Sequence, residues 1–406
     1  RIQAIFTSND TPLGECRLNT TTDPRGTVWL IFAGGIATQI LTIGIARFAY
    51  TPLLPVMRAQ AGLDAAGAGW LGAMIYLGYF AGTVVLSFLR RPAHRLWVFR
   101  AGLLLAVATT FQMGETTSLW HWSLSRVLAG FSGVAGMLLA AEFILFWLRD
   151  HGRRPDLGPH FAGIGIGICL SGVIAWAMGA GSPWDWQWRG FGWVALVLLP
   201  LAWALVPAPA AAVARGQGSA VRIEDTETRR WFWLFGGGYL AAGWTYAVGA
   251  TFVVDILTSA GSTGGTAAMA WVLLGLSNMV GAVAGSLIAR RLGSRPVLLS
   301  CMLAQALSLA ALTVPGATAL HVVAAVLFGA TFVVVVSLSL MEAGLRRPSA
   351  PGTAMARMTL MFGIGQIAGP IATGWLAGPA ASYAVPLVLG SLMALLGTLS
   401  MFAAGK

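Results

Sequence analysis

The chain has 406 residues, of which 57% are hydrophobic and only 10% are charged, with a formal net charge of +11. Soluble domains carry roughly 25% charged residues, so the charges here are too few to coat the about two or three soluble domains that this length would form. Of the 25 basic residues only Lys406 is a lysine, which excludes the phosphate-binding loop of an ATPase, because that loop needs an internal lysine.

Apolar stretches about as long as a membrane is thick follow one another along the chain. The twelve stretches are 27–50, 68–89, 96–114, 119–148, 161–181, 190–207, 231–255, 266–289, 296–314, 318–343, 353–377 and 383–404. Backbone groups inside lipid must find hydrogen bonds within the protein, and the strands of a barrel would be shorter, with alternating polarity. The sequence therefore predicts an all-α integral membrane fold with twelve transmembrane helices.

The basic residues indicate how these helices are oriented in the membrane. With the N-terminus inside, 20 of the 25 basic residues fall on the inner side, whereas only Arg58 and Arg189 fall on the outer side. The remaining three, Arg47, Arg126 and Arg357, lie within apolar stretches. We therefore expect a multi-pass protein of the plasma (inner) membrane with both termini in the cytoplasm, and we expect no nucleic acid as a partner.

A polar interruption with prolines, glycines and mixed charge separates six stretches from six. We therefore expect four parts: a cytoplasmic tail at 1–26, a six-helix bundle at 27–206, a cytoplasmic linker at 207–230 and a second six-helix bundle at 231–406.

The two halves repeat at an offset of 200 residues, which aligns Glu142 with Glu342. The same offset aligns two clusters of inner arginines: Arg90, Arg91 and Arg95 with Arg290, Arg291 and Arg295. Both halves begin on the inner side, so the repeat is parallel. A parallel repeat is typical of two bundles that enclose a binding site near the membrane midplane.

Three segments resemble a known family. Gly44-Ile-Ala-Arg47-Phe-Ala-Tyr50-Thr-Pro52-Leu-Leu-Pro55 resembles the first helix of the YbfB/YjiJ-type branch of the major facilitator superfamily, and Gly363-Ile-Gly365-Gln366-Ile-Ala-Gly369-Pro370 resembles the eleventh. Arg126-Val-Leu-Ala-Gly130 resembles the fourth helix of the superfamily. The resemblance covers residues 27–404 and implies secondary transport by alternating access, often linked to protons, with no cofactor.

Two arginines within the apolar stretches are the first candidates for binding a solute. A charged side chain costs roughly 3 kcal/mol or more at the centre of a membrane, so such residues are functional candidates by default. Arg126 comes about seven residues into the fourth stretch, and Arg47 comes about three residues before the outer end of the first. Arginine binds carboxylates bidentately, so we expect a small, anionic organic solute. Alternatively, either residue reaches toward water or caps backbone carbonyls.

Neutral polar side chains within the stretches are further candidates for the binding site. They are Gln39, Tyr76, Tyr246, Asn278 and Gln366. Hydrogen bonds between helices are the alternative role for each of them, because polar groups in lipid need partners.

Glu142 and Glu342 lie near the inner ends of their stretches, at the level of Arg90 and Arg91 and of Arg290 and Arg291 respectively. We expect ion pairs among these groups to act as a gate that breaks when the inner side opens. The competing interpretation is that Glu142 carries the coupling proton. The matching positions in the two halves favour the gate.

The remaining polar residues favour simpler roles. We expect Asp255, at the outer end of the seventh stretch, to be solvated, and His121 and His321 to be interfacial. No catalytic or metal-binding motif is found in the sequence, so we expect neither an enzyme nor a metal site. The expected partners are a small solute, the bilayer and protons, with the chain as a monomer. The alternatives are drug or metabolite efflux by proton antiport and, in another class, a non-transporting membrane sensor or enzyme.

Overall fold

The structure is a computed structural model that describes residues 24–89, 91–154, 156–208, 226–347, 351–378 and 382–405. Within these ranges it contains helices and no strands. The elements are α1 (Pro24–Gln39), η1 (Ile40–Ile45), α2 (Tyr50–Ala61), α3 (Ala65–Phe88), α4 (Pro92–Gln112), α5 (Leu119–Val134), η2 (Ala135–Ala140), α6 (Ala141–Asp150), α7 (Gly158–Met178), α8 (Trp184–Leu205), α9 (Thr226–Ser259), α10 (Gly264–Leu292), α11 (Ser294–Ala311), α12 (Thr318–Arg346), α13 (Pro351–Ala377) and α14 (Ala384–Ala403).

The predicted all-helical membrane architecture is confirmed for the described residues. Eleven helical segments are long and apolar enough to span a membrane. The first is built from α1, η1 and α2, and the third from α5, η2 and α6, where η1 and η2 are π-helices. The predicted stretch 96–114 is not among the eleven. It corresponds to α4, which carries Arg95 and Arg100 in its first turns. The expected tail lies outside the described residues up to residue 23, as does the expected linker from 209 to 225.

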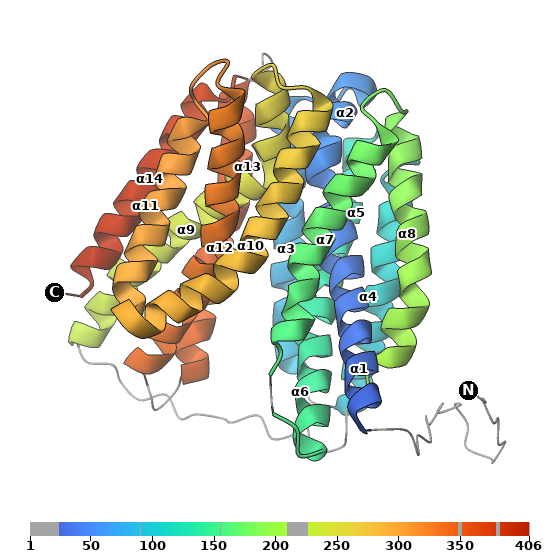
Figure 1. The fold of residues 1–406 in the computed structure, drawn as a ribbon, viewed down its shortest axis with the longest axis vertical. Helices are drawn as coiled ribbons and strands as arrows, with labels where there is room; N and C mark the ends of the chain where they lie inside the picture. The colour runs from blue at the N-terminus through green and yellow to red at the C-terminus, as the bar shows by residue number, and fades with distance from the viewer. Residues whose placement is uncertain are drawn as a thin grey trace.

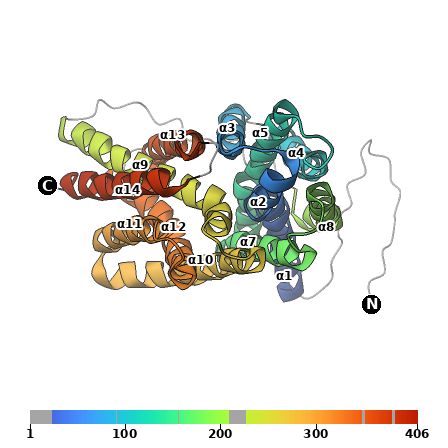
Figure 2. The same cartoon turned by 90° about the horizontal axis from the view of Figure 1, so that it is seen from above.

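The helices from α1 to α8 gather beside the helices from α9 to α14 (Figure 1). Figure 2 shows α3 facing α13, and α7 facing α10, across the boundary between these two groups. At the first of these contacts a side chain could not fit: a Cβ added at Gly69 of α3 would lie 3.0 Å from the Cα of Gly374 in α13. Glycine therefore permits the close approach of the two helices at this point.

The first span does not end near residue 50, and this prediction is wrong. The span runs for 36 residues from Gly26 to Ala61, because α2 continues the path of α1 and η1 after a turn at residues 46–49. Pro52 lies in the first turn of α2, where a missing N–H is tolerated, so the proline restarts the helix instead of ending the span. Arg47 consequently lies well inside the span and not near its outer end.

Candidate functional site

Arg126 is bound to the backbone where the first span is interrupted. The side chain is only 2% exposed, and its Nη1 donates to the carbonyl oxygens of Ala46 and Arg47 at 3.2 and 3.3 Å. Its Nη2 donates to the Arg47 carbonyl at 3.3 Å, and the guanidinium lies 4.5 Å from the centre of the Tyr50 ring. The geometry matches the alternative in which this arginine caps carbonyls.

The sequence explains why these carbonyls need a donor. Pro52 has no N–H, and the N–H of Thr51 donates to Phe48 at 3.2 Å. A regular helix would pair the carbonyl of Arg47 with the N–H of Thr51, which is already used. In the bilayer no water is available to replace that bond, so the buried guanidinium of Arg126 satisfies the carbonyl instead.

Arg47 lies in the interruption itself and faces aromatic rings from both groups of helices. Its guanidinium lies 4.7 Å from the ring centre of Tyr76 and 5.9 Å from that of Tyr79. Its Nη2 donates to the hydroxyl of Tyr246 at 3.3 Å, and the Tyr76 and Tyr246 rings meet edge to face. The structure thus brings together three predicted site residues, Arg47, Tyr76 and Tyr246.

Further aromatic rings extend this enclosure into the second group of helices. Phe332 of α12 and Phe362 of α13 lie with their ring centres 5.1 and 5.8 Å from that of Tyr246. We call Tyr76, Tyr79, Tyr246, Phe332 and Phe362 the aromatic enclosure. Tyr79 and the two phenylalanines were missed by the sequence analysis, because apolar rings in apolar stretches carry no signal that separates packing from binding.

Among the residues that the structure describes, no carboxylate balances the positive charge of Arg47. Ion pairs within 4.0 Å are found for Arg58, Arg95 and Arg189, whereas in the described ranges none is found for Arg47 or Arg126. The Nε of Arg47 is also buried without a hydrogen-bond partner. A half-buried cation with a free donor and flat apolar walls is suited to an anion that carries an aromatic ring.

No hydrogen bond among the described residues joins the aromatic enclosure to the other predicted binding residues, which are Gln39, Asn278 and Gln366. Gln39 is fully buried, and its Nε2 lies 2.9 Å from Nε2 of His160 in α7. Asn278 of α10 is buried with its Oδ1 unpaired, and Gln366 of α13 is half-buried. His160 was missed, because the predicted stretch 161–181 began one residue after it.

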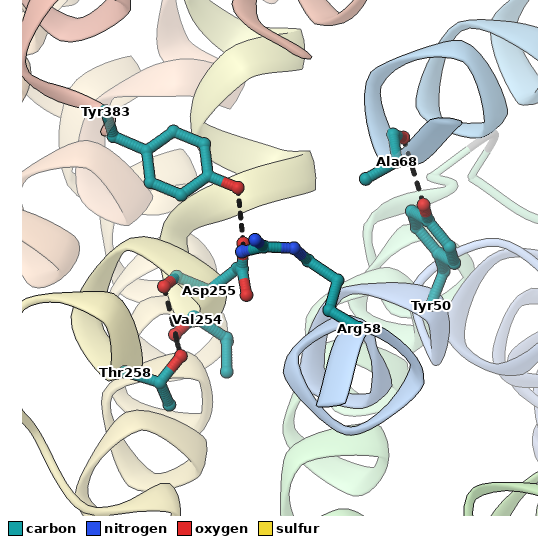
Figure 3. A network of polar contacts seen from close by, with 7 residues as sticks. All are labelled: Tyr50, Arg58, Ala68, Val254, Asp255, Thr258 and Tyr383. Atoms are coloured by element: carbon teal, nitrogen blue, oxygen red, sulfur yellow. Dashed lines mark hydrogen bonds and ion pairs between the residues drawn. The ribbon is translucent and has the colours of Figure 1, made fainter. Parts of the chain in front are cut away.

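Asp255 is buried at 2% exposure, so the prediction that it is solvated is wrong. Figure 3 shows Arg58 of α2 reaching Asp255 of α9, with the Tyr383 ring on the other side of the carboxylate. Arg58 Nη1 lies 2.6 Å from Asp255 Oδ2, and Tyr383 donates to the same oxygen. Because Arg58 and Asp255 come from different groups of helices, this ion pair joins the two groups.

The predicted gate residues have other partners. Glu142 forms an ion pair with Arg95 of α4, and Glu342 accepts a hydrogen bond from Ser294. Arg295 instead donates to the carbonyls of Met401 and Phe402 at the end of α14. The four predicted partners are exposed or lie outside the described residues: Arg91, Arg290 and Arg291 are exposed, and Arg90 is not described.

The two histidines expected at the interface differ from each other. His121 is exposed, in agreement with that expectation. His321 is fully buried, and its Nε2 lies 2.8 Å from the carbonyl oxygen of Val314, so the prediction is wrong for this residue.

Known proteins share this architecture. A family model described as "Uncharacterised MFS-type transporter YbfB" matches residues 39–402. The nucleoside transporter NupG has a TM-score of 0.71 at 15% identity, over 93% of this chain and 99% of that chain. A bacterial homologue of the human lysosomal transporter Spinster, inward-facing and occupied, has a TM-score of 0.66 at 14% identity, over 95% and 97%. At these identities the solved structures establish the fold alone. No curated protein sequence matches this chain.

Proposed function

Because the chain belongs to the YbfB-type family of major facilitator superfamily transporters, it is a multi-pass membrane transporter and not an enzyme, and we propose that its substrates are small organic anions with an aromatic ring. The observation that carries this proposal is the Arg47 guanidinium, which lies among the rings of the aromatic enclosure and has no carboxylate partner in the described part of the chain. The anionic group would pair with Arg47, and the ring of the substrate would pack against Tyr76 and Phe362.

We assign to the protein an alternating-access mechanism with two moving bodies, 27–206 and 231–406, a cytoplasmic tail at 1–26 and a linker at 207–230. Arg47 and Tyr246 come from different bodies, so an anion in the enclosure would contact both. The groups of helices diverge toward the end that holds α6, while α2, whose Arg58 pairs with Asp255 of α9, lies at the other end (Figure 1). We place the basic loops in the cytoplasm, with the protein in an inner membrane. In that orientation the helices diverge toward the cytoplasm, which corresponds to an inward-facing state. We propose that the protein acts as a monomer.

We further propose that protons drive the transport. Arg47 remains charged at every physiological pH, because the pKa of a guanidinium lies far above it. The anion site itself is therefore unsuited to carry the proton, and a different residue must take it up.

The experiment is a panel of radiolabelled solutes with the purified protein in proteoliposomes. The solutes are 4-hydroxybenzoate and benzenesulfonate as aromatic anions, succinate as an aliphatic anion, uridine as a nucleoside, and ethidium as a cationic dye. Protein-free liposomes give the passive flux, and benzenesulfonate stays ionised, so it cannot cross as a neutral acid. We expect gradient-dependent flux of the aromatic anions. Transport of ethidium alone would support drug efflux by antiport, and transport of uridine alone would place a neutral solute in the enclosure; either result would overturn the proposal.

A further inference from the structure

We propose that His160 is the residue that takes up and releases the coupling proton, an inference that rests on the proton-driven transport proposed above. His160 is the third residue of α7, and it is fully buried. It contacts neither Arg47 nor the aromatic enclosure by any hydrogen bond among the described residues. The proton and the anion would therefore bind at separate positions. Their binding is coupled when both positions act on the same conformational change.

The hydrogen bonds around His160 suit a ring that exists with and without its second proton. Nε2 lies 2.9 Å from Gln39 Nε2 and 3.2 Å from the carbonyl oxygen of Gly136. When Nε2 carries no proton, it accepts from the amide N–H of Gln39. When Nε2 is protonated, it donates to Gly136, and the side-chain amide of Gln39 can turn to present its oxygen.

Two unpaired atoms support this interpretation. In the described part of the chain, Gln39 Oε1 and His160 Nδ1 are both buried without a hydrogen-bond partner. The free oxygen of Gln39 is the acceptor that the protonated ring needs. A buried polar atom without a partner is unfavourable, and protonation of Nε2 would give the Gln39 oxygen a donor.

No charged side chain fixes the protonation of the ring among the described residues. The neighbours come from α1 (Gly35 and Gln39), η2 (Gly136), α6 (Ile144) and α7 itself (Phe161). None of these groups titrates. The carboxylate nearest along α6 is Glu142, which is paired with Arg95. Histidine is the side chain whose ordinary pKa lies closest to neutrality, so it is the residue type best suited to bind and release a proton.

His160 is linked to the anion site through both π-helices. Gln39 is the residue directly before η1, which leads into the turn that carries Arg47. Gly136 lies in η2, in the same span as Arg126, which binds that turn. π-Helices occur often at functional sites, and these two lie in the two spans that build the anion site. A change in the hydrogen bonds of His160 therefore acts on the segments that position Arg47.

The first test is direct and needs no substrate. The full-length protein, with ¹⁵N-labelled histidine, is placed in lipid nanodiscs, and the ring signals of its five histidines are followed by NMR as the pH changes. Replacing His94, His121, His151 and His321 one at a time assigns the remaining signal to His160 without a variant of that residue. We expect this signal to convert reversibly between the neutral and the charged form. A ring that stays neutral throughout the pH range of the folded protein would overturn the proposal.

The second test is transport in proteoliposomes with benzenesulfonate and 4-hydroxybenzoate. The variant His160→Gln is expected to keep exchange of anion across the membrane and to lose accumulation driven by a pH gradient. His321→Gln, which changes another buried histidine, is expected to keep both. Retained accumulation in His160→Gln, or loss of exchange together with accumulation, would exclude the coupling role. If the wild-type protein moves neither anion, the proposed substrate class fails, and the NMR titration still decides the role of His160.

Discussion

The Arg47 guanidinium donates a hydrogen bond to the Tyr246 hydroxyl at 3.3 Å, across 199 residues of sequence and across the boundary between the two groups of helices. The cation is therefore held by both groups at once. A ligand that takes over this donor would change a contact between the groups, so binding and helix movement are coupled at this point.

The tyrosines beside Arg47 should determine selectivity for aromatic anions. Replacing Tyr76 with leucine removes the ring nearest to the cation, at 4.7 Å, and with it an aromatic pair between Tyr76 and the substrate ring, worth about 0.5–1.5 kcal/mol. We expect the affinity for benzenesulfonate to fall by roughly 2- to 10-fold, while the affinity for succinate, which has no ring, changes less. Competition for exchange in proteoliposomes measures both values.

The matched control is Tyr79→Phe, which retains a ring 5.9 Å from the same guanidinium. It should leave the selectivity unchanged. Equal losses for benzenesulfonate and succinate in Tyr76→Leu would show that the ring supports the protein only and does not contact the substrate.

Arg126 should matter for folding more than for affinity. The variant Arg126→Ala leaves the carbonyls of Ala46 and Arg47 without their donor, and each buried unpaired group costs about 1–3 kcal/mol. We therefore expect a lower melting temperature of the protein in detergent. Arg189→Ala removes an exposed pair with Glu115 and should leave the melting temperature nearly unchanged. A fully stable Arg126→Ala protein that fails only to bind anions would make this arginine a substrate ligand.

The pair Arg58 and Asp255 should hold the outer side closed. Removing one partner of a buried ion pair costs about 3–5 kcal/mol, because the other charge stays buried and unpaired. We expect Arg58→Ala to separate α2 from α9, measured by double electron–electron resonance between spin labels at the exposed positions Ala59 and Ser259. The exchanged pair Arg58→Asp with Asp255→Arg should restore part of the closed population. An unchanged distance distribution in Arg58→Ala would argue against a gate.

Glu142 should tune the inner side without carrying the proton. The ion pair with Arg95 is partly exposed, with side chains 20% and 17% accessible, so its loss should cost about 0–1 kcal/mol. We expect Glu142→Gln to keep accumulation driven by a pH gradient and to change only the rate. Glu342→Gln, at the matching position of the second half, is the control. Exchange without accumulation in Glu142→Gln would assign the proton to Glu142 and contradict the role proposed for His160.

Much of the fold could be predicted from the sequence because lipid imposes a simple rule. Only apolar helices of a given length can cross the bilayer, and their basic ends mark one side. The rule fails where a span is interrupted. The predicted stretch 27–50 ends too early because α2 continues the span after the turn, so Arg47 is predicted too close to the outer end.

The site could be predicted only where a charged residue within lipid signals function. Arg47 and Arg126 carry that signal, but their separate roles depend on the backbone of the turn at 46–49. Asp255 was misjudged because its partners, Arg58 and Tyr383, come from distant helices. His160 has partners on α1 and η2 that no local pattern reveals. Pairings between helices are set by packing and not by the periodicity of one segment.

The account depends most on Arg47 as the anchor of the anion, and calorimetric titration of the purified protein with benzenesulfonate tests this most directly. Arg47→Gln keeps a long polar side chain and removes the charge, and a charge-assisted hydrogen bond is worth about 1.5–3 kcal/mol. We predict saturable binding to the wild-type protein and roughly 10- to 100-fold weaker binding to Arg47→Gln at an unchanged melting temperature. Equal binding by the two proteins would contradict the account.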